Sequence, residues 1–372
     1  MKAETFQGKR LFLVFFSYII NMKKIILFLL LIIPICAEAS AEAYVVMDAD
    51  SGRVIDSYNK DEKMLIASTT KIMTSIVAIE NSNVDIVIEA GDEINKVYGS
   101  MIYIKNGEAL TLESLLYGLM LRSGNDAAMA IAENTLGYDK FIYAMNGKAK
   151  ELKMYNTIFE NPHGLDDDSK NYSTAYDMAL LMKYAMKNDE FIKITSTKKY
   201  KVTTNMNTHI WYNKNELLSS YKYTTGGKIG YTKKSGHIFV SSASKDDKNL
   251  IVVTFKDSDR FNTHKYLYEK NFNKYNKYQI LDKYNFFVDE KYYKKYHLYI
   301  KNDFYMLLSD NEKKDLLIEI NLIKNKKIKS DEQVGSVVVK LKNNIIHTEP
   351  IYISIKESKI KKIKSILSFW KK

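Results

Sequence analysis

The chain has 372 residues, of which 46% are apolar and 27% are charged, with only 15 glycines and 3 prolines. This length is enough for about two to three domains, and the composition excludes a disordered, collagenous or low-complexity protein. The net charge of +12 is concentrated near one end, because residues 271–372 hold 22 lysines and 12 acidic residues, whereas residues 44–270 hold equal numbers of each sign. An enzyme of nucleic acids carries its positive field around its working surface, so no nucleic-acid partner is expected.

Cys36 is the only cysteine, which excludes a disulfide within the chain and a cysteine metal cluster. The 6 histidines show no spacing that is typical of metal ligands. We therefore expect no metal site.

Residues 1–43 have the features of a targeting segment. Two lysines precede an apolar run from Ile25 to Ile35, and small residues at alternate positions follow it. A basic start, a short apolar core and a small-x-small end are typical of a secretory signal peptide, for which Met22 is the expected start of translation. The run is shorter than the roughly 20 residues that cross a bilayer. A membrane hairpin is the alternative if residues 1–21, which hold a second apolar run, belong to the protein.

Residues 44–275 are expected to form one α+β domain. β-branched residues on both sides of the turn at Asp48–Gly52 predict two strands, and the sequence after Lys199 again favours strands. Between them, apolar residues at helical spacing predict buried helices. The expected helices are Ser68–Glu80, Thr111–Leu121 (capped by Thr111), Asp126–Asn134, Ser173–Lys187 and Asn262–Asn273. Helices grouped between strands indicate packing on an antiparallel sheet.

The end of the chain has a different composition. Residues 280–355 are rich in lysine, tyrosine and short β-branched runs, which predicts a small all-β domain. Residues 356–372 predict an amphipathic basic helix that is typical of an anchor on a membrane surface. Its apolar residues at helical spacing are Ile360, Ile363, Leu367 and Trp370. A helix packed on the β domain and a lysine-rich tail are the alternatives.

Three short motifs stand in order in the α+β domain: Ser68-Thr69-Thr70-Lys71, Ser123-Gly124-Asn125 and Lys228-Ile229-Gly230. Positions i and i+3 lie on one face of a helix. The amine of Lys71 can therefore take the proton of the Ser68 hydroxyl, if burial or a nearby cation lowers the pKa of that amine. The same S-x-x-K spacing begins at six other serines, but Ser68 opens the most apolar helix, where an unpaired lysine would be costly.

With the sequence around them, these motifs resemble the serine D-alanyl-D-alanine carboxypeptidases, the low-molecular-mass penicillin-binding proteins of bacterial cell-wall metabolism. The resemblance covers about residues 43–270 in detail and rests on five blocks in the family's order. They are Ala67–Thr74, Leu115–Ala128, Asn161–Asp166, Gly227–Thr232 and Ser235-Gly236. It implies a β-lactamase/transpeptidase-like fold for the α+β domain, with the small all-β domain after it.

The resemblance also implies a role for each matching residue. Ser68 would be the acylated nucleophile and Lys71 its general base. The N–H groups of Ser68 and Tyr231 would bind the oxyanion. Ser123 would relay protons from across the cleft, and Asn125 would hold the backbone amide of the substrate.

Lys228 and Gly230 would lie on the strand edge that binds the substrate, where Lys228 adds positive potential near the substrate carboxylate. Arg260 matches an arginine that helps to bind the terminal carboxylate, with a structural ion pair as the alternative. The Asn161–Gly164 segment is expected to form a shaped loop near the site, in which His163 is structural.

The sequence departs from the family at Ile229, where threonine or serine is usual. That hydroxyl donates to the carboxylate of the substrate or antibiotic, and a hydrogen bond to a charged group is worth about 1.5–3 kcal/mol. The substitution therefore bears on affinity and substrate choice, and Lys228, Arg260 and Thr232 are the residues that can compensate. Acylation needs only Ser68, Lys71 and the oxyanion hole.

Together these features predict a secreted serine D,D-carboxypeptidase that is peripheral on the outer face of the cytoplasmic membrane. It would remove the terminal D-Ala from peptidoglycan pentapeptide stems through a Ser68 acyl-enzyme, bind β-lactams covalently and need no cofactor. A β-lactamase of the same fold is disfavoured, because no glutamate after Ser123-Gly124-Asn125 lies in a recognisable loop that would activate a deacylating water. A catalytically impaired wall-binding protein is the other alternative, and only Ile229 supports it.

Overall fold

The computed structural model describes residues 41–354 except 168–169, 289–290, 295 and 324–328. Residues 1–40 of the predicted targeting segment and the anchor predicted over residues 356–372 therefore lie outside the described residues. In the parts of the chain that are described, no helix has both the length and the apolar composition that a bilayer-crossing segment needs.

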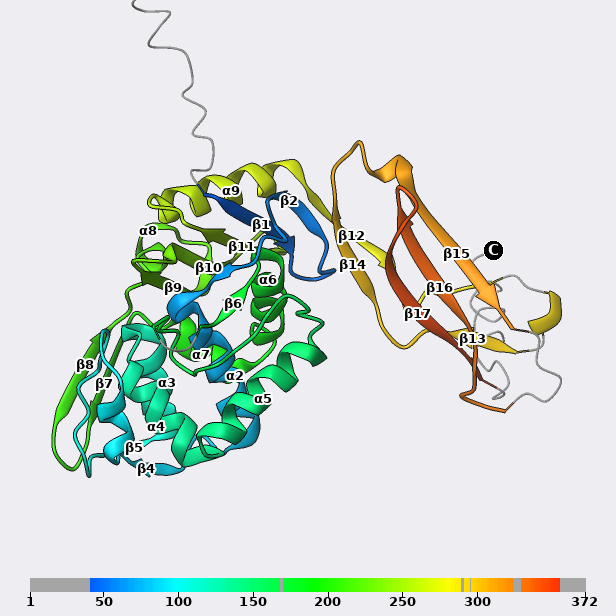
Figure 1. Ribbon diagram of the computed structural model, residues 1–372. Coiled ribbons are helices and arrows are strands. Elements are labelled where there is room, and N and C mark those ends of the chain that lie inside the picture. Colours follow the sequence, from blue (N-terminus) through cyan, green and yellow to red (C-terminus); the bar gives the residue numbers. More distant parts are fainter. Residues whose placement is uncertain (1–40, 168–169, 289–290, 295, 324–328, 355–372) are drawn as a thin grey trace, which may run out of the picture. The chain divides into compact units, whose positions relative to one another are not determined.

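A five-stranded antiparallel sheet is the framework of the larger domain (Figure 1). The two strands predicted on either side of the Asp48–Gly52 turn pair with each other, and the first of them also pairs with a strand from the end of the domain, where Val46 lies opposite Val252. The strand order is β2 (Val54–Tyr58), β1 (Ala43–Asp48), β11 (Lys248–Phe255), β10 (Gly236–Lys245) and β9 (Thr224–Thr232). β9 is an edge strand, so one of its sides is open to a ligand.

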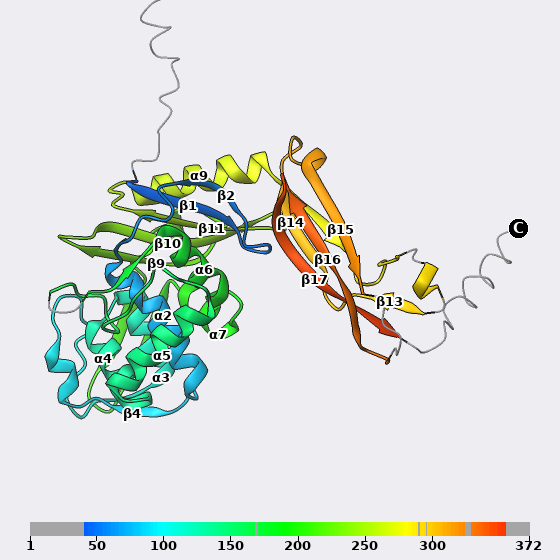
Figure 2. The same cartoon turned by 45° about the vertical axis from the view of Figure 1, so that its right-hand side comes forward.

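Alternate side chains of these strands enter two separate cores, because successive residues of a strand point to opposite faces. Phe239 and Val252 pack with residues of α9 (Arg260–Lys274) on one face. Ile238 and Val240 pack into a cluster of helices on the other face. Figure 2 shows the sheet between α9 and this cluster. The helices of the cluster are α2 (Lys71–Asn81), α3 (Leu112–Tyr117), α4 (Asn125–Thr135), α5 (Tyr138–Glu151), α6 (Ala175–Ala185) and α7 (Asp189–Ser196).

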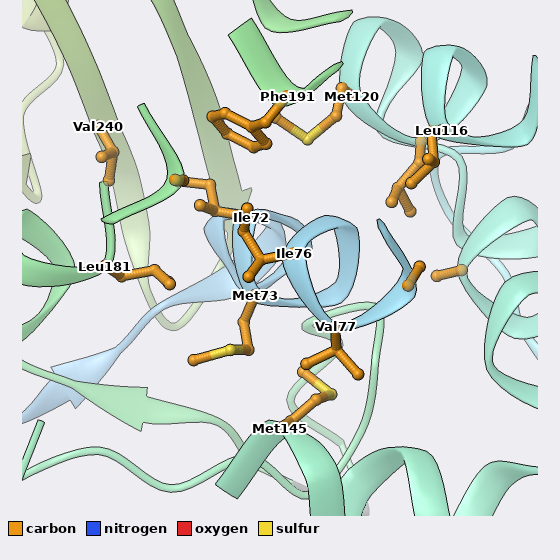
Figure 3. Packing of buried hydrophobic residues seen from close by; sticks show 14 of the residues in the cluster. Ile72, Met73, Ile76, Val77, Leu116, Met120, Met145, Leu181, Phe191 and Val240 are labelled. Atoms are coloured by element: carbon orange, nitrogen blue, oxygen red, sulfur yellow. The ribbon is translucent and has the colours of Figure 1, made fainter. Parts of the chain in front are cut away.

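α2 lies at the centre of the helical cluster (Figure 3). Its apolar side chains are almost completely buried and point in several directions, toward residues such as Met145 of α5 and Leu181 of α6. A helix that is apolar on all sides is stable only when other elements surround it. The first residue of α2, Lys71, is therefore held by the best-packed element of the domain. The labelled α2 side chains are Ile72, Met73, Ile76 and Val77.

The predicted helices are found with shifted ends. The first one consists of a 3₁₀ turn over Ala67–Thr70 followed by α2, and the second consists of α3 followed by a π-helical turn over Gly118–Arg122. Thr111 caps α3 as predicted, since its side chain accepts from the N–H of Ser114. Neither α5 nor α7 is predicted from the sequence, because polar and charged residues cover most of their turns.

Three short strand pairs border the helices. They are β3 (Met64–Leu65) with β6 (Tyr172–Ser173), β4 (Val87–Glu89) with β5 (Ala109–Thr111), and β7 (Lys199–Thr203) with β8 (Thr208–Tyr212). A four-residue helix, α8 (Leu217–Ser220), precedes β9. Its Leu217 packs into the core on the α9 side of the sheet.

The smaller domain is all-β, as predicted, and has a hydrophobic core of its own. One of its sheets pairs β12 (Asn276–Leu281) with β14 (Phe304–Leu308). The other has the order β13 (His297–Tyr299), β17 (Asn344–Ser354), β16 (Gln333–Leu341) and β15 (Leu316–Leu322). The predicted α+β class of the larger domain is likewise confirmed.

Candidate active site

Ser68 and Lys71 meet as the first motif predicts. Ser68 lies in the 3₁₀ turn directly before α2, and the Nζ of Lys71 lies 3.0 Å from its Oγ. The preceding residue, Ala67, has a φ of 44°, an uncommon conformation for a residue with a side chain. Lys71 is fully buried, whereas Ser68 is half-buried. The hydroxyl is thus accessible and the amine is not.

Two further acceptors fix the amine of Lys71. It donates to Oδ1 of Asn125 over 2.7 Å and to the carbonyl oxygen of His163 over 2.5 Å. Burial, and secondarily the charge of Lys228, holds the pKa of Lys71 well below its usual range. A neutral amine has two N–H donors and one lone pair. With both donors engaged by Asn125 and His163, the lone pair is left to accept the proton of Ser68.

Asn125 is the first residue of α4 and is held from both ends of its amide. Its Nδ2 donates to the carbonyl oxygen of Tyr98 over 2.5 Å. The next residue, Asp126, accepts from the backbone N–H groups of Ile102 and Tyr103 at 3.0 Å and 2.8 Å. Asp126 therefore fastens the segment before residue 104 to α4, and this segment fixes the amide that orients Lys71.

Ser123 faces Lys228 from across the cleft. Ser123 follows the π-helical turn with a φ of 67°, and its Oγ accepts from the Nζ of Lys228 over 2.9 Å. The same amine donates to the carbonyl oxygen of Ile229 over 2.9 Å. Burial, followed by the charge of Lys214, lowers the pKa of Lys228 to about 7. Lys228, which is hydrogen-bonded to Ser123, can therefore gain or lose a proton near neutral pH.

Gly230 allows the edge strand β9 to lie against the turn that holds the nucleophile. A Cβ at this position would lie 3.1 Å from the backbone nitrogen of Thr69 and 3.2 Å from that of Ser68. These contacts are tighter than most real Cβ contacts, so the close approach needs a glycine. Tyr231, the next residue, is 57% exposed and lies on the rim of the cleft.

The Asn161–Gly164 segment is the shaped loop that its sequence predicts. Oδ1 of Asn161 accepts from the backbone N–H groups of His163 and Gly164 at 3.2 Å and 2.6 Å. Burial, and then the charge of Lys71, lowers the pKa of the His163 ring to about 3, so the ring is neutral. The contribution of His163 to the site is its carbonyl oxygen, a contact that no sequence motif indicates.

The site contains a cleft of about 240 Å³, whose lining does not include Lys71, Asn125 or Lys228. From the set predicted by motif, its lining includes Ser68, Ser123, Gly230, Tyr231 and Arg260. Ile229, Ser100, Lys214 and His237 also line it. Lys214 donates to Oγ of Ser100 over 3.4 Å. In a chain with so many lysines, nothing in the sequence around Lys214 marks it as part of the site, and His237, although it follows the Ser235-Gly236 block, is not predicted.

Arg260 begins α9 and lies over the ring of Phe261, with its Cζ 4.6 Å from the ring centroid. Among the described residues no carboxylate forms a close ion pair with it, although the charges of Glu216 and Asp257 act on its guanidinium. Its Nε is buried and finds no hydrogen-bond partner in the described ranges. A half-buried guanidinium that lines a cleft and has an unused donor favours an anionic ligand.

A metal centre finds no support at this site. Across the described ranges, no group of three or more histidine, cysteine, aspartate or glutamate side chains is arranged to hold a metal ion.

Two family models match this chain, one over the larger domain and one over the smaller domain. The family model for D-alanyl-D-alanine carboxypeptidase matches residues 33–259, and the model for the C-terminal domain of penicillin-binding protein 5 matches residues 275–359. The crystal structures of penicillin-binding protein 5 from Haemophilus influenzae resemble this one with a TM-score of 0.72 at 26% sequence identity, covering 85% of this chain and 97% of that chain.

Two curated relatives are similar over the larger domain. The D-alanyl-D-alanine carboxypeptidase DacF of Bacillus subtilis is 34% identical over 222 residues, which are 58% of this chain and 57% of DacF. DacC of Escherichia coli is 36% identical over 241 residues, which are 60% of this chain and 59% of DacC. The matched region thus spans less than two thirds of either relative. Because the family model covers more than half of the chain, the protein belongs to the D-alanyl-D-alanine carboxypeptidase family.

Proposed function

We propose that this protein is a serine D,D-carboxypeptidase that removes the terminal D-Ala from peptidoglycan pentapeptide stems. Its chief support is the buried amine of Lys71, whose two N–H groups are engaged by Asn125 and His163 while its third direction faces Oγ of Ser68. A buried, neutral amine one turn from a serine is suited to removing the proton of that serine.

In the proposed acylation step, Ser68 Oγ attacks the carbonyl carbon between the two D-Ala residues and Lys71 accepts its proton. The carbonyl oxygen becomes an oxyanion, for which the N–H groups of Ser68 and Tyr231 are the proposed donors. Collapse of the tetrahedral intermediate breaks the peptide bond, and the leaving amine takes a proton through Ser123. Lys228, bonded to Ser123 over 2.9 Å, replenishes that proton.

Water completes the cycle by attacking the acyl-enzyme: its proton passes through Ser123 to Lys228, which gave up a proton during acylation, and protonated Lys71 returns a proton to Oγ of Ser68 as the ester bond breaks and the shortened stem leaves. A β-lactam ring presents an equivalent carbonyl to Ser68, so we propose that β-lactams acylate the same oxygen. Asn125 is the proposed ligand of the substrate backbone. Lys228 and Arg260 are the proposed cations for the terminal carboxylate, and Gly230 and Tyr231 the strand edge along which the substrate lies.

The proposed place of action is the outer face of the cytoplasmic membrane. The basic and apolar pattern of residues 22–43 supports export by a cleaved signal peptide. The alternation of apolar residues and lysines in residues 356–372 supports attachment to an anionic membrane surface. Both segments are supported by their sequence alone.

The proposal is tested by incubating the purified protein with a fluorescent penicillin and measuring the intact mass. We expect one covalent adduct, which Ser68→Ala abolishes. Ser219→Ala is the matched control, because Ser219 begins the same S-x-x-K spacing on the surface and should leave the adduct unchanged.

Release of D-Ala from a synthetic pentapeptide then separates the candidate functions. Acylation with release of D-Ala indicates a carboxypeptidase. Fast hydrolysis of the penicillin without action on the peptide would indicate a β-lactamase. An adduct that persists after Ser68→Ala would contradict the assignment of the nucleophile.

A further inference from the structure

His237 lies on the same face of the sheet as Ile229, at the end of the cleft where Arg260 begins α9. On β10, His237 pairs with Tyr231 of β9, two residues beyond the Ile229–Phe239 pair. Directly paired residues on antiparallel strands point to the same face, and so do residues two apart on one strand. His237, Ile229 and Arg260 all line the cleft.

Two contacts hold His237 in this place. Its ring lies against that of Tyr231, with the centroids 4.4 Å apart and the planes inclined by 31°. Its carbonyl oxygen accepts from the N–H of Asp257 over 2.9 Å. Since Asp257 lies three residues before Arg260, the same short turn fixes the position of His237 and of the arginine.

The charges around His237 favour a neutral ring while the cleft is empty. Burial lowers the pKa of His237, the cation of Arg260 lowers it further, and the carboxylate of Asp257 opposes them. The group of β9 that faces the His237 ring is the ring of Tyr231. Lys256, which lies near the neighbouring Gly236, is paired with Glu42. Arg260, which lines the same cleft, is therefore the cation that disfavours a charged His237 ring.

A ligand carboxylate beside Arg260 would reverse this balance. It would neutralise the cation that disfavours a charged imidazole and would add an anion that favours one. The cleft also lacks a hydroxyl at position 229, so the carboxylate needs a donor from elsewhere. An imidazolium has two N–H donors and forms charge-assisted hydrogen bonds with carboxylates.

We propose that His237 binds the terminal carboxylate of the ligand together with Arg260, and that its imidazole supplies the donor that is missing at Ile229. This inference rests on the proposed function of the cleft. Binding of a carboxylate ligand is then coupled to the uptake of a proton by His237, so such ligands bind more tightly at mildly acidic pH.

The test compares the second-order acylation rates of a penicillin and its methyl ester between about pH 5.5 and pH 8. Both ligands need neutral Lys71, so their ratio cancels the titration of the base. In the wild type we expect the acid-to-ester ratio to rise about ten-fold toward acidic pH. In His237→Gln the ratio should be smaller and should change less with pH, because only Lys228, whose pKa is about 7, then titrates beside the carboxylate in this range.

The controls separate a charge effect from a loss of shape. His297→Gln, an exposed histidine of β13, should keep the wild-type ratio at every pH. His237→Phe preserves an aromatic ring against Tyr231 and should behave like His237→Gln. A ratio that changes with pH as steeply in both substitutions at His237 as in the wild type, or an equal loss for acid and ester at all pH values, would overturn the proposal.

If neither ligand acylates the wild type, the proposed function is wrong, and equilibrium binding then decides the role of His237. The probe is the intact penicillin, titrated onto Ser68→Ala with and without His237→Gln. Binding that tightens more steeply toward acidic pH when His237 is present would support the role of this residue. Binding with the same pH dependence in both variants would overturn it.

Discussion

Gly164 lies so close to Ala67 that no side chain fits between them. A Cβ on Gly164 would lie 1.9 Å from the carbonyl oxygen of Ala67, and Gly164 has a φ of +88°. Ala67 precedes the proposed nucleophile, and His163, which precedes Gly164, supplies the carbonyl oxygen that accepts from Lys71. The contact thus brings the turn of Ser68 together with the loop that orients its base.

Gly164→Ala should therefore damage the site as well as the fold. The backbone of the loop must shift away from Ala67, since the carbonyl group that it would meet is itself backbone, and a positive φ is unfavourable for alanine. We expect a loss of about 2–4 kcal/mol in the free energy of unfolding and a fall of at least ten-fold in the acylation rate. Thermal denaturation and penicillin acylation measure the two effects.

Gly147→Ala is the matched control for this substitution. Gly147 lies on the exposed side of α5, and a Cβ there meets nothing within 4 Å. Alanine is favoured over glycine inside a helix by about 1 kcal/mol, so this variant should be as active as the wild type and slightly more stable. Equal behaviour of the two variants would contradict the role assigned to the Gly164–Ala67 contact.

Lys71→Ala should abolish acylation while leaving the protein folded. The substitution removes the only amine that reaches Oγ of Ser68 in the described structure, and α2 keeps its buried apolar residues. Intact mass after incubation with penicillin measures acylation, and circular dichroism measures the fold. Lys105→Ala, which changes an exposed lysine, is the control. Full acylation of Lys71→Ala would contradict the assignment of the base.

The same substitution should change how stability depends on pH. The folded-state pKa of Lys71 is lowered, mainly by burial, so above that pKa the unfolded chain binds a proton that the folded protein does not. Stability then rises with pH up to the ordinary lysine pKa, by at most about 1.4 kcal/mol per pH unit for each such group. The free energy of unfolding, measured with urea, should therefore rise less between about pH 7 and pH 10 in Lys71→Ala than in the wild type. An unchanged slope would mean that Lys71 is charged in the folded protein.

Lys214→Gln should shift the pH profile of acylation. The charge of Lys214 contributes to lowering the pKa of Lys71 and of Lys228. Without that charge both values rise, so the acidic limb of the profile moves to higher pH, because Lys71 must be neutral to act as the base. We expect a loss of about three- to ten-fold at neutral pH that disappears at alkaline pH. Lys214→Arg preserves the charge, so the acidic limb of its pH profile should coincide with that of the wild type.

The site residues that the sequence alone could bring together are those that lie within one short motif. Ser68 and Lys71 are one helical turn apart, and Ser123 and Asn125 flank a turn before a helix, so the sequence alone brings each pair together. The contact of Lys71 with the carbonyl oxygen of His163 joins residues 92 positions apart, and any residue type offers such a carbonyl. Lys214 enters the cleft through packing for which the sequence carries no local signal, whereas His237 enters it through the pairing of two consecutive strands, which its motif block does not reveal.

The helices and strands likewise differ in how far the local sequence predicts them. Strongly apolar helices such as α2, and strands rich in β-branched residues such as β11, were predictable from their periodicity. α5 was not, because its apolar residues Phe141, Met145 and Ala149 form one narrow stripe among charged residues. Its stability comes from contact with α2, which is a tertiary effect.

Ile229→Thr addresses the position at which this chain departs from its family. Ile229 lines the cleft and is half-buried, so a hydroxyl there can reach a ligand carboxylate. One additional hydrogen bond to a charged group would raise the second-order acylation rate by about ten-fold, since about 1.4 kcal/mol corresponds to one power of ten. The methyl ester of the same penicillin should gain little, because it presents no charge to the new hydroxyl.

Arg260→Ala should reduce the acylation rate more in the wild type than in Ile229→Thr, because the wild type has fewer other partners for the carboxylate. The measurement is a double-mutant cycle with the wild type, both single variants and the double variant, each with the acid and the ester. Coupling that appears with the acid and vanishes with the ester indicates that the two positions share the carboxylate. If acid and ester gain equally from Ile229→Thr, position 229 acts by shaping the cleft, and the hydrogen-bond explanation is wrong.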